Sequence, residues 1–144
     1  MKKIFDTTLQ NRKLLYKILD NTPKEQLLEI PTGFRNNIWW NIAHVVVTQQ
    51  LLVYKFSDLQ VRVPEEYIEK FKKGTVPDGT ATDDEMKEIA GFLISTADWA
   101  REDYDSEMFK EFKNTEFVLH HVHDEFKIKV PDNVRAEVYP RKRN

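Results

Sequence analysis

One stretch, "NIWWNIAHVVVTQQLL" at residues 37–52, constrains the fold of this chain more than any other. Apolar residues between positions 36 and 57 cover most of the circumference of a helix, and the length of the segment favours a helix over a strand. A helix that is apolar nearly all round lies at the centre of a bundle or in a subunit interface. The segment therefore predicts a helical bundle whose most apolar helix contains one histidine, His44.

The other segments predict further helices and a change of pattern near the C-terminus. Apolar spacing predicts helices over residues 4–20 and 82–105, and prolines predict short helices over 23–29 and 64–73. The sequence around Thr22 and Thr82 predicts a capping box at each. "EFKIKV" and "VRAEVY", on either side of a turn, predict a β-hairpin over about 126–139. With 144 residues, we expect one mainly α domain spanning 1–144.

The composition excludes several functional classes. The chain has no cysteine, which rules out disulfides, thiolate nucleophiles and zinc bound by cysteine. The net charge of −2, without a basic excess, argues against a nucleic-acid partner. The longest apolar stretch is too short to span a membrane and there is no signal-like N-terminal segment, so we expect a cytoplasmic protein with no membrane partner. Neither a glycine-rich phosphate loop nor a G-x-S-x-G motif is present.

The four histidines are the main candidates for chemistry, because neutral imidazoles bind zinc and nickel, and a catalytic site needs about three protein ligands. Three of them lie in "HHVHD". If this segment is a strand, His121 and His123 share a face and form a three-histidine set with His44. If it is helical, His120 and Asp124 share a face and form a two-histidine, one-carboxylate set with His44. The alternation that follows favours the strand.

Without a metal, His44 is a core histidine that bonds a backbone carbonyl or a hydroxyl, and "HHVHD" is a polar surface segment. Other candidates have mainly structural interpretations. Gln49 and Gln50 are either capped or solvated amides, or partners that orient the imidazole. The tryptophans are expected in the core or an interface, and the acids at 83–85 at a helix start: these are Trp39, Trp40, Trp99, Asp83, Asp84 and Glu85.

Trp40, His44 and Thr48-Gln49-Gln50, within "GFRNNIWWNIAHVVVTQQLLVYKFSDL" and before "FKKGTVP", resemble the DinB/YfiT-like superfamily. The resemblance covers residues 1 to about 125. It implies a four-helix bundle with an up-down-down-up course, often dimeric, and a divalent metal (zinc or nickel) held by three histidines. His44 matches the ligand from the second helix. The family's other two ligands form an H-x-x-x-H pair in the last helix, and this chain has no H-x-x-x-H.

The resemblance implies a metal-dependent hydrolase or thiol transferase acting on a small molecule, with an incomplete metal site unless "HHVHD" replaces the missing pair. The alternative is a non-catalytic, dimeric helical-bundle module for binding or structure that has lost the metal. If the last helix is absent, the other helices lose a neighbour and a single chain exposes an apolar patch. We therefore expect a homodimer in which the second subunit covers the helix at 36–57 or its neighbours.

Overall fold

The computed structural model describes residues 1–109, and this part of the chain is all-α, without a strand. All predicted helices within it are present, while the hairpin predicted at 126–139 lies outside the described residues. Beyond α3 the chain continues through a π-helical turn, Gln50–Tyr54, and a 3₁₀ turn, Lys55–Ser57. The five α-helices are α1 (Lys2–Asn21), α2 (Lys24–Leu28), α3 (Ile38–Gln49), α4 (Glu65–Phe71) and α5 (Asp83–Asp105).

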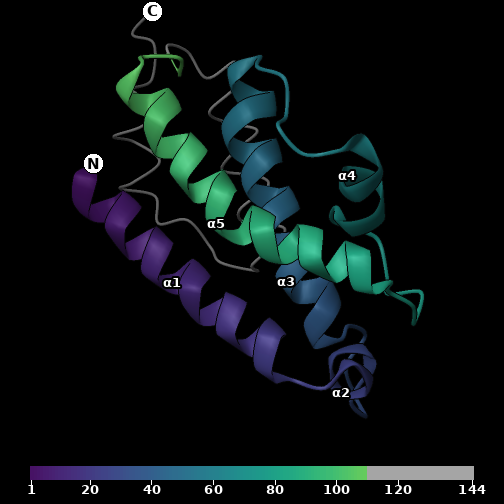
Figure 1. Ribbon diagram of the computed structural model, residues 1–144. Coiled ribbons are helices and arrows are strands. Elements are labelled where there is room, and N and C mark those ends of the chain that lie inside the picture. The colour runs from purple at the N-terminus through teal and green to yellow at the C-terminus, as the bar shows by residue number, and fades with distance from the viewer. Residues whose placement is uncertain (110–144) are drawn as a thin grey trace, which may run out of the picture.

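The apolar helix α3 lies at the centre of the described bundle, as its sequence predicts. It contacts each of the other four α-helices, and Figure 1 shows it passing behind α5, with α4 to one side. Leu19 of α1, Leu27 of α2 and Ile89 of α5 belong to the same buried cluster as its side chains. Six residues of α3 are buried: Trp39, Trp40, Ile42, Ala43, Val46 and Val47.

Helices α1 and α5 run side by side and form the most extensive helix pair (Figure 1). The buried face of α5 is largely apolar and centres on Ile89 and Leu93. In α1 the buried residues are Leu19 and, unexpectedly, Arg12. The outer face of α1 leaves apolar side chains in solvent, with Ile4 and Leu14 each 59% exposed and Ile18 45% exposed.

Polar side chains fix where the helices begin. Asn37 precedes α3 and accepts a hydrogen bond from the backbone N–H of Trp40 at 2.7 Å. The predicted capping box at α5 is confirmed: the Thr82 hydroxyl accepts from the Glu85 N–H, and the Glu85 carboxylate accepts from the Thr82 N–H. The capping box predicted at Thr22 is wrong, because Thr22 follows α1 in an extended conformation and Pro23 takes the position before α2.

The π-helical turn follows α3 directly and interrupts its α-helical hydrogen-bond pattern. The N–H of Lys55 bonds to the carbonyl of Gln50, five residues earlier, so the turn holds one residue more than an α-helical turn. Tyr54 is buried at its end. The following Asp58 has a left-handed backbone with φ of 59° and closes the helix. Single π-helical turns occur often at functional sites, so the side chains around Tyr54 are candidates for such a site.

Candidate functional site

His44 projects from α3 towards the C-terminal end of α4. Its Nδ1 lies 2.6 Å from the backbone carbonyl oxygen of Phe71. A carbonyl oxygen only accepts hydrogen bonds, so Nδ1 must carry the proton and donate. In the neutral imidazole Nε2 is then the acceptor nitrogen, and the Thr48 hydroxyl lies 3.2 Å from it. The fold therefore selects one tautomer of His44.

Trp40 fixes the plane of the imidazole from one side. The two rings stack with centroids 4.4 Å apart and an interplanar angle of 15°. The indole N–H of Trp40 donates to the Thr75 hydroxyl at 3.0 Å, and that hydroxyl donates to the Lys72 carbonyl at 2.8 Å. The turn after α4 thus holds Trp40, and Trp40 in turn holds His44, so the ring has little freedom to rotate.

This geometry suits a metal ligand, because metal-binding histidines usually donate their second ring N–H to a carbonyl or carboxylate. It equally satisfies a core histidine that bonds a carbonyl and a hydroxyl. The other members of both predicted ligand sets, His120, His121, His123 and Asp124, lie outside the described residues. Within residues 1–109 no three His, Cys, Asp or Glu side chains gather in a way that could hold a metal ion. Both ligand sets remain predictions.

The two glutamines after Thr48 bond away from His44 and tie the bundle together. Gln49 Nε2 donates to the Thr96 carbonyl of α5 at 2.9 Å. Gln50 is completely buried, donates to the Gln49 side chain at 2.9 Å and accepts from the backbone N–H of Arg62 at 2.6 Å. Their role in the described structure is to connect α3 to α5 and to the loop before α4.

Sequence reasoning missed Arg12, which is only 4% exposed. Its Nη1 donates to the Leu93 carbonyl at 3.4 Å and to the Thr96 hydroxyl at 3.3 Å. Burial lowers the pKa of the guanidinium to about 10, so it remains a cation at neutral pH. One signal was available, since position 12 falls between Leu9 and Leu15 on the face of α1 that faces the core.

A second polar cluster lies where the π-helical turn meets the end of α5. The Tyr54 hydroxyl and Arg62 Nη1 both donate to the same oxygen of Asp103, the latter at 3.1 Å. Arg62 also stacks 4.4 Å from the ring centroid of Trp99. Burial, followed by the hydrogen bond to Asp103, raises the pKa of Tyr54. Tyr54, Arg62 and Asp103 border an open cavity of about 430 Å³ that Leu59 also lines.

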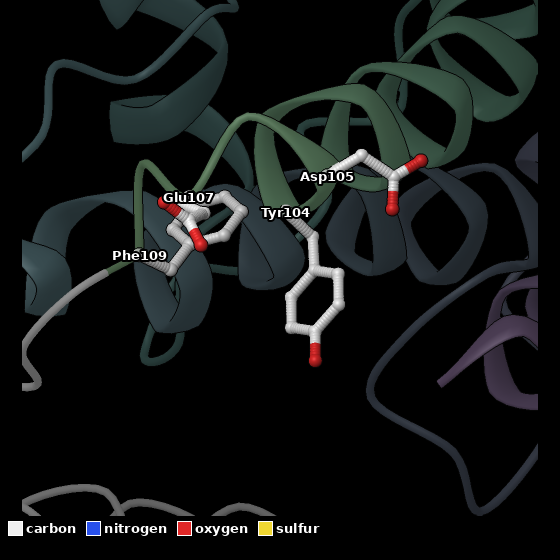
Figure 2. A pocket seen from close by; sticks show the side chains of 4 residues that line it. All are labelled: Tyr104, Asp105, Glu107 and Phe109. Atoms are coloured by element: carbon white, nitrogen blue, oxygen red, sulfur yellow. The ribbon is translucent and has the colours of Figure 1, made fainter.

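A second cavity, of about 560 Å³, lies at the C-terminal end of α5. Figure 2 shows the four residues that line it, Tyr104, Asp105, Glu107 and Phe109. The Asp105 carboxylate points away from Glu107 and towards the opposite side of the helix end, so the two acids do not converge. This arrangement offers no paired carboxylates for acid–base chemistry.

The comparisons with known proteins identify the family. A family model described as the DinB superfamily matches residues 7–125. The chain belongs to the DinB superfamily. The all-α architecture of the described residues agrees with the DinB bundle. Neither the curated proteins nor the solved structures gave a match. No helix within residues 1–109 is long and apolar enough to cross a membrane.

Proposed function

We propose that this DinB protein binds a divalent metal, zinc or nickel, through Nε2 of His44, and acts as a hydrolase or thiol transferase. The observation that carries the proposal is the hydrogen bond from Nδ1 to the Phe71 carbonyl, which leaves Nε2 as the nitrogen with the ligating lone pair. The stack on Trp40 supports the proposal, because a ring that is already fixed loses less conformational entropy when it binds an ion. His121 and His123, or else His120 and Asp124, complete the ligand set.

When bound, such a metal lowers the pKa of a coordinated water or thiol and supplies a nucleophile near neutral pH. The chain's own contribution at His44 is to keep the proton on Nδ1 and to hold the ring plane. Thr48, whose hydroxyl lies beside Nε2, then has to rotate away from the ligating lone pair. Of these requirements, only the rotation of the Thr48 hydroxyl away from Nε2 separates a ligand histidine from one that fills the core.

Metal analysis of the untagged protein tests the proposal. We expect close to one equivalent of zinc or nickel in the wild type and its loss in His44→Ala. The matched control is Thr48→Val, which keeps the imidazole and removes only the neighbouring hydroxyl, and it should retain the metal. A wild-type content below about 0.2 equivalents would reject the proposal, since a site with three protein ligands retains zinc through purification.

Single substitutions of the proposed ligands other than His44 distinguish the two ligand sets. If His121 and His123 are ligands, alanine at either position releases the metal, whereas His120→Ala and Asp124→Ala retain it. The reverse pattern identifies the two-histidine, one-carboxylate set. Equal retention in all four variants would show that neither set holds the ion.

The second candidate is a metal-free bundle that serves as a dimeric binding or structural module. It is favoured by the fact that both ring nitrogens of His44 have partners in the fold, Phe71 and Thr48. We also propose a homodimer, supported by the exposed apolar side chains of Ile4, Leu14 and Ile18 on α1. Light scattering at micromolar concentration should give twice the mass of the chain, and the mass of a single chain would contradict the dimer.

A further inference from the structure

Arg12 is a buried cation whose hydrogen bonds leave most of its donors unused. A guanidinium carries five N–H donors, and in residues 1–109 only Nη1 makes hydrogen bonds, to the Leu93 carbonyl and the Thr96 hydroxyl. Both distances, 3.4 and 3.3 Å, exceed the usual 2.9–3.0 Å of such bonds. Neither acceptor is charged, and no carboxylate within residues 1–109 forms an ion pair with Arg12.

An arrangement of this kind is costly for a purely structural residue. Removing a guanidinium from water is unfavourable unless an opposite charge or a full set of acceptors compensates it. An apolar side chain of similar length, such as methionine, would fill the same space between α1 and α5 without that cost. An arginine at this position is therefore better explained by an anion that supplies the missing charge and acceptors.

The unused donors of Arg12 are not sealed. In the described part of the chain, the side-chain nitrogens and oxygens that are both shut off from solvent and without a partner are Trp39 Nε1 and Ser57 Oγ. Nε and Nη2 of Arg12 make no hydrogen bond within residues 1–109 and yet are not in that group. These two nitrogens therefore keep some contact with solvent, although the residue as a whole is 96% buried.

The polar groups that accept hydrogen bonds from Arg12 belong to α5, and one of them, Thr96, is linked to α3. Thr96 of α5 accepts from Arg12 through its hydroxyl, while its carbonyl accepts from Gln49 of α3 at 2.9 Å. Within residues 1–109, Arg12 of α1 thus bonds to α5 alone, and Thr96 of α5 is bonded in turn to α3 through Gln49. A fixed, weakly hydrated fork of donors is the geometry that recognises two oxygens of a carboxylate or phosphate.

We propose that Arg12 is the recognition group of an anion site between α1, α3 and α5, which takes the carboxylate or phosphate of a small molecule. The site goes beyond the proposed metal function and does not depend on it, because none of its groups contacts His44. Anion binding can therefore be measured on metal-free protein, and its failure would leave the metal proposal untouched.

The test measures thermal unfolding of the full chain in inorganic phosphate or acetate, against sodium chloride at equal ionic strength. We expect phosphate or acetate to raise the melting temperature by about 3 °C or more once its concentration exceeds Kd many-fold. The anion with the larger effect identifies the phosphate or the carboxylate as the natural group. Arg12→Met should lose the shift. The control Arg101→Met removes a partly exposed arginine that pairs with Asp98 and Asp6, and it should keep the shift.

A second measurement keeps the proposal testable if Arg12→Met fails to fold. In wild-type protein labelled with ¹⁵N, the Nε–Hε resonance of Arg12, assigned with Arg12→Lys, should move and saturate during the same titrations. Three results would overturn the proposal: no rise in melting temperature beyond chloride, an equal rise in Arg12→Met, or an Nε–Hε resonance that stays in place.

Discussion

Two buried charges, Asp103 and Arg12, lie in the same bundle. Within residues 1–109 only Asp103 has a hydrogen-bonded partner of opposite charge. Asp103 receives hydrogen bonds from Tyr54 and Arg62 on one carboxylate oxygen, so a cation and a hydroxyl compensate its charge. Arg12 has one neutral carbonyl and one neutral hydroxyl, both at long distance. A compensated charge is what a fold needs in order to hold its elements together. A buried charge without a partner is able to bind an ion of opposite charge. Substitutions at the two residues distinguish these roles.

The largest effect is expected at Asp103. Replacing it by alanine leaves the Arg62 guanidinium and the buried Tyr54 hydroxyl without their acceptor, and we predict a loss of about 3 kcal/mol in the free energy of unfolding. Tyr54→Phe, which removes a single hydrogen bond, should cost about 1 kcal/mol. Urea denaturation measures both. An Asp103→Ala variant as stable as the wild type would show that this cluster does not hold the π-helical turn to α5.

A smaller effect is expected at Glu85, a compensated charge at the start of α5. The N–H of Thr82, and after it the Lys70 ammonium, lower the pKa of Glu85. Because the folded pKa lies below the unfolded value of about 4.3, the stabilisation is present above that pH and is lost as pH falls through the folded pKa.

Glu85→Gln should therefore flatten the dependence of stability on pH in the acid range, by less than about 1 kcal/mol for this partly exposed pair. Unfolding by urea at a series of acid pH values gives the slope. Glu102→Gln, at an exposed position of the same helix, is the matched control and should leave the slope as it is in the wild type.

The smallest effect is expected at Arg12, and this result would separate the two charges most clearly. Arg12→Met removes a charge that nothing compensates within residues 1–109, and keeps most of the side-chain volume, so stability should stay within about 1 kcal/mol of wild type. Denaturation in chloride-only buffer is the measurement, because bound anions would stabilise the wild type alone. A loss as large as that of Asp103→Ala would make Arg12 a structural clamp and would remove the contrast.

The helices were predictable because their signals are local. Apolar spacing located α1, α3 and α5, and the Thr82–Glu85 box marked the start of α5 within one turn. Thr22 failed as a cap although its local pattern was similar, since Pro23 took the position before α2 and Thr22 ended α1. Local rules do not decide which of two adjacent helix ends a residue serves.

The site was predictable only in part, because its partners are distant in sequence. His44 stood out as a lone histidine in an apolar run, but its carbonyl partner, Phe71, is 27 residues away and carries no side-chain signal. The contact between Arg12 and Thr96 joins positions 84 residues apart. A sequence shows that an arginine falls on the inner face of a helix. It does not show whether a carboxylate of another helix lies close enough to pair with it.

The pairing of α1 with α5 has a consequence for the synthesis of the chain. Helix α1 precedes its main partner, α5, by more than sixty residues of sequence. Until residues near 105 have left the ribosome, the apolar face of α1 cannot be buried where it belongs, and early packing must rely on α3. The nascent bundle therefore closes late, when most of the family domain has been translated.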